Sequence, residues 1–173
     1  AVQNLYDFIW DEFCDWYIEL VKPRLGTDKN PQNVLIYVLS NILKLLHPFM
    51  PFITEEIYSY LPVTDKKSIM ISDWSVAKDE LNFDADEENL ETIKEAIKAV
   101  RNLRAEMNVP PSKKAKLVII TEDTELFTLG TAFYLKLAGA NEVVVTKDKA
   151  EIPENSVSVV VNKAEIFMPQ GDL

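Results

Sequence analysis

The chain has 173 residues, of which 47% are apolar and 27% are charged, and its formal net charge is −10. This composition is typical of a globular protein, and no apolar run approaches the ~20 residues that a membrane-spanning helix needs. The acidic balance argues against broad, sequence-independent binding to a polyanion, although it leaves room for a local basic patch.

The residue census excludes several classes of active site. One histidine and one cysteine cannot supply a zinc site of the usual Cys/His type, and four scattered glycines cannot form a phosphate-binding glycine loop. The acidic pairs Glu55–Glu56 and Glu87–Glu88 are adjacent in sequence, so on a helix their side chains diverge and favour a solvated face. We therefore expect no catalytic site and no metal site.

The sequence also indicates a cellular setting. Cys14 is the only cysteine, so no intrachain disulfide can form, and a reduced compartment fits best. The stretch AVQNLYDFIWDEF has no basic region and carries acids within its apolar pattern, so it is not a signal peptide. We expect a cytoplasmic protein without a membrane segment.

Three helices are predicted in the N-terminal part. Apolar residues recur at steps of three and four through residues 2–21, with acids on another face. A second helix is expected to begin at Pro31, with Asn30 as its N-cap, and to carry a wide apolar stripe suited to a bundle core.

Two prolines interrupt the apolar helical pattern of LLHPFMPFITEEI. A proline disfavours the helical conformation of the residue before it, so the second helix should end at about His47. Pro51 suits the first turn of a third helix. The prolines therefore predict a rigid elbow. We expect Phe49 and Met50 to fill the gap between the helix ends, and His47 to be hydrogen-bonded at the end of its helix.

A long irregular connection is expected over residues 62–89, with a short extended piece in KSIMISDW. A fourth helix is predicted from about Asp86 to Met107, because acids crowd its N-terminal end as the helix dipole favours. Pro110 and Pro111 forbid its continuation. Its inner stripe consists of Leu90, Ile93, Ile97, Val100 and Leu103.

After these prolines the apolar residues are no longer spaced as in a helix but form short runs typical of β-strands. AKLVII, NEVVVT, SVSVVV and AEIFMP are turn-bounded runs rich in β-branched residues, and a helix that stops near Gly139 lies between the first two. The predicted fold is mainly α: an antiparallel helical bundle, residues 1–112, followed by a small α/β subdomain, residues 113–173.

The bases gather in one segment. Glu91–Lys116 holds seven bases and three acids, a net charge of +4 within a chain of −10. On a helix Lys94, Lys98 and Arg101 fall within about 60° of one another, whereas Arg104 projects onto the apolar stripe and must snorkel or meet a partner. Such a ridge could track a phosphate backbone, but a solvated helix face balanced by acids is an equal alternative.

The stretch LLHPFMPFITEEIY resembles the helix-turn-helix signature of the anticodon-binding bundle in class I aminoacyl-tRNA synthetases of the valine, isoleucine, leucine and methionine group. YDFIWDEFCDWYIELVKPRL and ETIKEAIKAVRNLRAEMNVPPSKKAKLVI are similar to the corresponding helices of the valyl enzymes. With KSIMISDW and NEVVVT…VVVNKAEIFMP, the resemblance covers nearly the whole chain.

Several features of that family are absent here. With His47 as the only histidine, an H-x-G-H motif is impossible, and DKKSIM is not the K-M-S-K-S motif. The catalytic half, the editing domain and the C-terminal coiled-coil arm are missing, and Ser75 stands where the family usually has proline. The chain is therefore expected to be a C-terminal piece of a longer synthetase.

The resemblance implies that the parent enzyme attaches valine to its tRNA, with ATP and magnesium held in the absent half and no cofactor in this chain. The chain itself would bind the anticodon stem-loop of valine tRNA, weakly and as a monomer. We expect phosphate contacts from Lys94, Lys98, Arg101, Lys113 and Lys114. Arg104 is assigned to a base or to a structural carboxylate.

Lys22 and Arg24 are further candidates for tRNA contact, and Tyr17 is a candidate for base stacking, whereas Trp16 is expected in the core. Two alternatives leave the fold unchanged: the same domain of an isoleucyl-type synthetase, and a protein-interaction module without RNA binding. A stand-alone enzyme has no supporting residues.

Overall fold

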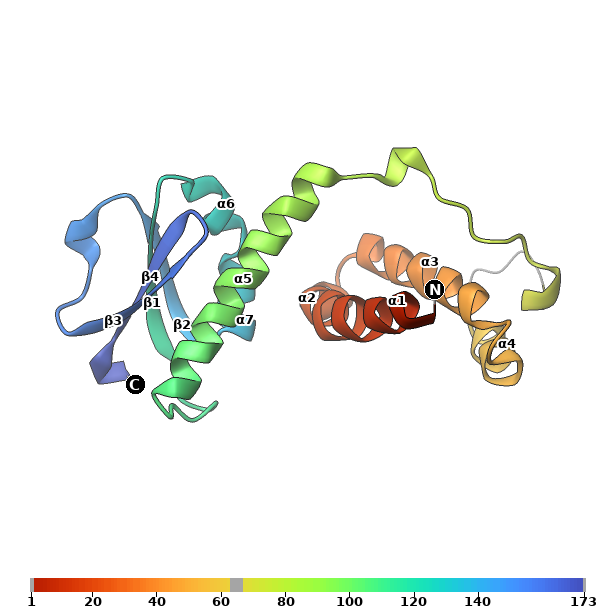
Figure 1. The fold of residues 1–173 in the computed structure, drawn as a ribbon, viewed down its shortest axis with the longest axis horizontal. Coiled ribbons are helices and arrows are strands. Elements are labelled where there is room, and N and C mark those ends of the chain that lie inside the picture. The colour runs from red at the N-terminus through yellow and green to blue at the C-terminus, as the bar shows by residue number, and fades with distance from the viewer. Residues whose placement is uncertain (1, 63–66, 173) are drawn as a thin grey trace. The chain divides into compact units, whose positions relative to one another are not determined.

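The computed structural model describes residues 2–62 and 67–172, which divide into two compact units, Ala1–Glu80 and Leu81–Leu173. Unit 1 is helical, whereas unit 2 combines helices with a four-stranded sheet (Figure 1). Helices together with a small α/β part were predicted, and this coarse fold class is confirmed. No helix within the described ranges is long and apolar enough to cross a membrane.

Unit 1 begins with one continuous helical segment, as predicted for residues 2–21. Its ends, α1 (Val2–Asp7) and α2 (Glu19–Val21), are α-helical, whereas η1 (Phe8–Ile18) between them is a π-helix. The longer helices are α3 (Lys29–Leu46) and α4 (Pro51–Ser59). Short 3₁₀ turns lie at η2 (Lys22–Arg24), η3 (Ile69–Ile71) and η4 (Asp79–Leu81).

The cap of α3 differs from the prediction. Asp28 has an extended backbone, and its Oδ1 accepts a hydrogen bond from the Asn30 backbone N–H at 2.9 Å. An N-cap residue needs such a non-helical backbone immediately before the first turn. Asn30 already lies within the helix, so Asp28 is the cap and the assignment to Asn30 is wrong.

The proline elbow is confirmed at both helix ends. α3 ends at Leu46 with His47 as its C-cap, and Pro51 is the first residue of α4. His47 Nδ1 and Thr54 Oγ1 are hydrogen-bonded at 2.8 Å, which agrees with the predicted role of the histidine. The expected filling of the gap is wrong, because Phe49 and Met50 are both exposed.

The core of unit 1 joins α3, α4 and η3. Leu43, Tyr58 and Ile69 form a buried apolar cluster. Glu55 was expected on a solvated face, but its carboxylate accepts hydrogen bonds from Ser68 Oγ at 3.0 Å and from the Ile69 backbone N–H at 3.2 Å. These bonds fix a 3₁₀ turn where an extended piece was predicted. Residues 63–66 of the predicted connection lie outside the described residues.

Unit 2 is built on a mixed sheet of order β2-β1-β4-β3, in which β1 pairs with β2 in parallel and the other pairs are antiparallel. All four strands were predicted in sequence. They are β1 (Ala115–Thr121), β2 (Ala140–Thr146), β3 (Ser156–Val161) and β4 (Ala164–Pro169), with 3₁₀ turns η5 (Lys149–Glu151) and η6 (Gln170–Asp172). The crossover from β1 to β2 is two short helices, α6 (Thr124–Leu129) and α7 (Thr131–Leu137).

The fourth predicted helix is α5 (Asp84–Glu106), and it belongs to unit 2. Its apolar face, with Ile93, Ile97 and Val100 buried, packs beside α6, α7 and β3 (Figure 1). The predicted boundary after residue 112 grouped this helix with the preceding ones, whereas the compact units divide after Glu80. A functional domain of residues 1–112, and an antiparallel bundle within it, stay predictions.

Candidate functional site

The predicted basic segment ends where α5 turns into β1. Helix α5 stops at Glu106, Asn108 takes a left-handed conformation with φ 54°, and Pro110 and Pro111 follow. The Val109 backbone N–H donates to the Arg104 carbonyl at 2.9 Å, which closes the last turn. The segment 108–114 is called the α5–β1 elbow below.

Arg104 lies beneath this elbow. Its side chain is only 6% exposed, and Nη2 donates to the backbone carbonyls of Lys113 and, at 3.5 Å, Pro110. A base or a structural carboxylate was expected as the partner of this guanidinium, and its observed partners are backbone carbonyls. Nη1 is buried without a hydrogen-bond partner within the described part of the chain. Arg104 therefore holds the elbow against α5 and retains an uncompensated charge.

Gly139 lies close to the Arg104 guanidinium. Its φ is +69°, and a Cβ at this position would lie 3.1 Å from Arg104 Cζ and 3.2 Å from Nη2. Both the left-handed backbone and the close approach require glycine here. The sequence predicted Gly139 only as a helix stop, and its contact with Arg104 was missed.

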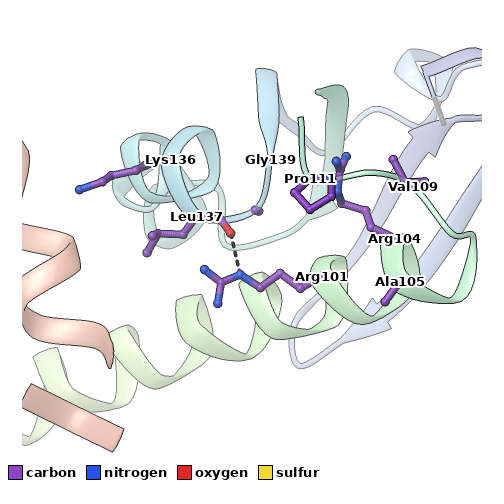
Figure 2. A pocket seen from close by; sticks show the side chains of 9 residues that line it. Arg101, Arg104, Ala105, Val109, Pro111, Lys136, Leu137 and Gly139 are labelled. Atoms are coloured by element: carbon purple, nitrogen blue, oxygen red, sulfur yellow. Dashed lines mark hydrogen bonds between the residues drawn. The ribbon is translucent and has the colours of Figure 1, made fainter. Parts of the chain in front are cut away.

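Arg101 connects α5 to the end of α7. Its Nε donates to the Leu137 carbonyl at 2.7 Å, the bond drawn as a dashed line in Figure 2. The last carbonyls of a helix have no partners within the helix, and a cation is favourable beside them. Arg101 is exposed, so it serves this contact at the edge of the unit rather than in its core.

These residues surround a cavity of about 370 Å³, called the Arg104 cavity below. Figure 2 shows that its lining comes from α5, the α5–β1 elbow and the end of α7, with Arg104 turned toward Pro111 and Lys136 extending away from Arg104. The lining residues are Arg101, Arg104, Ala105, Val109, Pro111, Lys136, Leu137, Ala138 and Gly139.

Lys136 is the cationic lining residue that the sequence analysis missed. It lies in the last turn of α7, far along the chain from the predicted basic segment. A lysine in the last turn of a helix is common, because it suits the helix dipole, so the local pattern carries no binding signal. Only the packing of α7 beside α5 brings Lys136 to the same cavity as Arg101 and Arg104.

The remaining bases of the predicted ridge differ in their exposure to solvent. Lys98 is exposed on α5, and Lys113 and Lys114 are exposed on the α5–β1 elbow. Lys94 is only 2% exposed, and its Nζ lies 2.5 Å from Glu91 Oε1. A buried ammonium cannot contact a phosphate backbone without rearrangement, so the structure removes Lys94 from the predicted surface ridge.

The candidates of unit 1 have local partners. Lys22 forms an ion pair with Glu19, and Arg24 pairs with Asp28 at 2.7 Å, where its hydrogen bond lowers the pKa of the Asp28 carboxyl. Tyr17 is half-buried and stacks on Phe13 with ring centroids 6.1 Å apart. Burial raises the pKa of the Tyr17 hydroxyl. One face of this ring is thus already occupied.

Trp16 is buried, as predicted. Exposed aromatics of unit 1 lie elsewhere, and two of them line a second, mostly apolar cavity of about 330 Å³. This Trp74 cavity is lined by Val2, Leu5, Leu45, Pro48, Phe49 and Trp74. Sequence reasoning missed it because Phe49 was assigned to the interior of the elbow. Across the described ranges, no group of three or more His, Cys, Asp or Glu residues is placed to hold a metal ion.

Comparison with known proteins gives a consistent result. Residues 1–119 match the family described as the anticodon-binding domain of tRNA ligase. The whole chain is 51% identical to a valine–tRNA ligase of Clostridium acetobutylicum, 40% to that of Enterococcus faecalis and 36% to that of Bacillus anthracis. In each case the chain spans 20% of the length of the relative.

Proposed function

Because the chain belongs to the family of anticodon-binding domains of tRNA ligases, we propose that it binds the anticodon stem-loop of a valine tRNA. The observation that carries this proposal is similarity along the entire chain, including residues 120–173 beyond the family match, to valine–tRNA ligases at 36–51% identity. A different amino acid specificity has no comparable support among these relatives.

The proposed parent protein is a valine–tRNA ligase in which this chain supplies tRNA recognition. The chain spans about a fifth of the length of its relatives, so the chemistry belongs to segments outside it. There we place the ATP and magnesium that activate valine. The chain itself contributes no catalytic group, acts as a monomer and works in the cytoplasm.

Each unit offers a different chemistry toward RNA. In unit 2, exposed Lys98, Lys113 and Lys114 lie on α5 and its elbow, where they suit phosphate oxygens. In unit 1, the exposed rings of Phe49 and Trp74 line one cavity. Unpaired anticodon bases are commonly recognised by stacking on such rings and by hydrogen bonds to their edges. Phosphate contacts therefore orient the RNA, and the Trp74 cavity provides the stacking surface.

The test is a titration of the 173-residue chain with valine tRNA and with the same tRNA carrying a swapped anticodon, at low and moderate salt. We expect tighter binding of the cognate tRNA and an affinity that falls as salt rises, because phosphate contacts release counterions. Lys98→Glu should weaken binding, whereas Lys149→Glu, a matched reversal on an exposed 3₁₀ turn of the same unit, should not.

Two other outcomes would change the assignment. Preference for an isoleucine tRNA would indicate the isoleucyl-type domain. Equal and salt-independent affinity for all tRNAs would overturn RNA recognition and favour a protein-interaction module. The observation that favours such a module is the apolar surface of unit 1, where Phe52 is 90% exposed and Met70 is 79% exposed.

A further inference from the structure

We propose that the Arg104 cavity binds a phosphate group of the RNA backbone, with Arg104 as the buried charge and with Arg101 and Lys136 as donors at the rim. This inference rests on the proposed function for its choice of RNA. It assigns a specific contact to unit 2 and adds Lys136, at the end of α7, to the residues that meet the nucleic acid.

Arg104 carries a buried charge that is not compensated within the described residues. A guanidinium stays protonated in proteins, and a buried one is normally paired with an anion. Arg104 is 6% exposed, its hydrogen bonds go to two backbone carbonyls, and no described residue offers Nη1 a hydrogen-bond partner. No carboxylate from residues 2–62 or 67–172 forms an ion pair with it. The missing counter-charge therefore comes from a ligand.

The composition of the cavity lining also favours an anion. Among the described residues that form the cavity wall, three are basic and none is acidic, although the chain as a whole carries −10. The other lining side chains, such as Val109, Pro111 and Leu137, are apolar. Apolar walls lower the local dielectric constant and so strengthen the attraction of an anion to the bases.

The basic side chains and the size of the cavity favour a phosphate as the anion. Arginine matches the planar, multidentate geometry of phosphate oxygens, and a lysine adds a mobile point charge. A volume of about 370 Å³ accommodates a phosphate with its ester groups. Lys113 and Lys114 are exposed on the elbow that forms one wall, so a phosphate chain that enters the cavity meets further cations outside it. This continuity favours a backbone phosphodiester over an isolated phosphate ion.

Binding requires only side-chain movement. Nη1 of Arg104 is covered in the structure. A phosphate in the cavity is therefore attracted first by the charge of the guanidinium, and it accepts a hydrogen bond from Nη1 only after a small shift of that group. Arg101 keeps its Nε on the Leu137 carbonyl, and its guanidinium is a multidentate donor on the wall of the cavity. Lys136 is exposed, and its long side chain can reach the rim by changing rotamer.

The experiment follows amide and arginine side-chain signals by NMR while inorganic phosphate, and separately an anticodon stem-loop RNA, is added to the 173-residue chain. We expect both probes to shift the signals of Leu137, Ala138 and Gly139 and of the Arg104 Nε–H group, and phosphate to compete with the RNA. The double variant Arg101→Gln/Lys136→Gln should abolish the phosphate-induced shifts. It should also lower the slope of log affinity against log salt for the RNA by about 1, because both side chains meet the same phosphate.

Two further variants distinguish the loss of a phosphate-binding charge from the loss of a structural hydrogen bond. Arg101→Lys keeps the positive charge but changes the donor that meets the Leu137 carbonyl. If Arg101 acts by binding phosphate, this variant should retain most of the dependence of RNA affinity on salt. Lys149→Gln removes an exposed charge of the same unit outside the cavity lining and should leave the cavity signals unchanged.

The possible failures are distinguishable. RNA binding that is the same in Arg101→Gln/Lys136→Gln as in Lys149→Gln would overturn the cavity inference and leave the proposed function intact. Cavity signals that respond to phosphate in a chain that binds no RNA would show a site for free phosphate. That result would overturn both the RNA contact and the proposed function. No shift with either probe would overturn the anion site itself.

Discussion

Gly139 leaves no room for a side chain beside the guanidinium of Arg104. A Cβ at residue 139 would lie 3.1 Å from Arg104 Cζ, and Gly139 has φ +69°. Because Arg104 also donates to the carbonyls of Lys113 and Pro110, this one side chain of α5 lies close both to the α5–β1 elbow and to the residue before β2. The contact couples the shape of the Arg104 cavity to the packing of unit 2.

Gly139→Ala is therefore expected to destabilise the chain. The left-handed backbone is unfavourable for alanine, and the added methyl group crowds the guanidinium, so we expect a loss of about 1–3 kcal/mol in the free energy of unfolding. Urea unfolding measures this change. Gly26→Ala is the matched control, because no described residue beyond its chain neighbours comes within 4 Å of its added Cβ and Gly26 has no left-handed φ. Equal effects of the two substitutions would contradict the close contact.

Tyr134→Phe is expected to stabilise the protein. Tyr134 is fully buried, and its hydroxyl has no hydrogen-bond partner in the described ranges. An unpaired buried hydroxyl loses its hydration without compensation, so its removal should raise the free energy of unfolding by about 1 kcal/mol. Thermal or urea unfolding at neutral pH tests this. A destabilised variant would mean that the hydroxyl has a favourable partner after all.

The same residue predicts a pH dependence. Burial raises the pKa of the Tyr134 hydroxyl well above its ordinary value of 10.0. The unfolded chain loses this proton near pH 10 while the folded chain keeps it, so the unfolded state binds fewer protons there and stability falls as the pH rises. The contribution that protonated Tyr134 makes to the free energy of unfolding is therefore fully present below pH 10. Tyr134→Phe should flatten this alkaline decline, which unfolding curves between neutral and high pH would measure.

Lys94 and Lys98 should respond differently to the same substitution. Lys94 is buried against Glu91, whereas Lys98 is exposed on the same helix. Lys94→Gln should lower stability, because Glu91 loses its partner and a packed side chain is altered, and should change RNA affinity little. Lys98→Gln should keep stability and weaken RNA binding, with a salt slope lower by about 1. Parallel unfolding and RNA titrations compare the two variants, and a reversed pattern would contradict the observed burial.

Trp74→Ala should weaken binding of an anticodon stem-loop without unfolding unit 1. A stacked base contributes about 1–3 kcal/mol to affinity, and Trp74 is an exposed ring in the lining of the Trp74 cavity. Trp10→Ala is the control, since Trp10 is also exposed but lies beside Tyr6 and outside that lining. If RNA quenches tryptophan fluorescence equally in both variants, Trp74 is not the stacking surface.

The elements of this fold were largely predictable because their signals are local. Pro51 starts α4 and the residues before Pro48 end α3, since a proline acts on its own turn and on its neighbour. The β-branched runs became the four strands for a similar reason. The single predicted helix before Gly139 divides at Gly130, where an added Cβ would lie 2.8 Å from the Tyr134 ring.

The site was less predictable. The sequence alone placed Arg104 on the apolar stripe and required a partner for it, because helical geometry determines which side chains share a face. Tertiary structure decided that its partners are elbow carbonyls, that Lys94 is buried, and that Lys136 joins Arg101 and Arg104 at one cavity. The physical reason is distance along the chain: Arg101 and Leu137 are 36 positions apart, and only the packing of α5 beside α7 brings their atoms within 2.7 Å. Local patterns determine helices and strands, whereas the grouping of charges depends on how those elements pack.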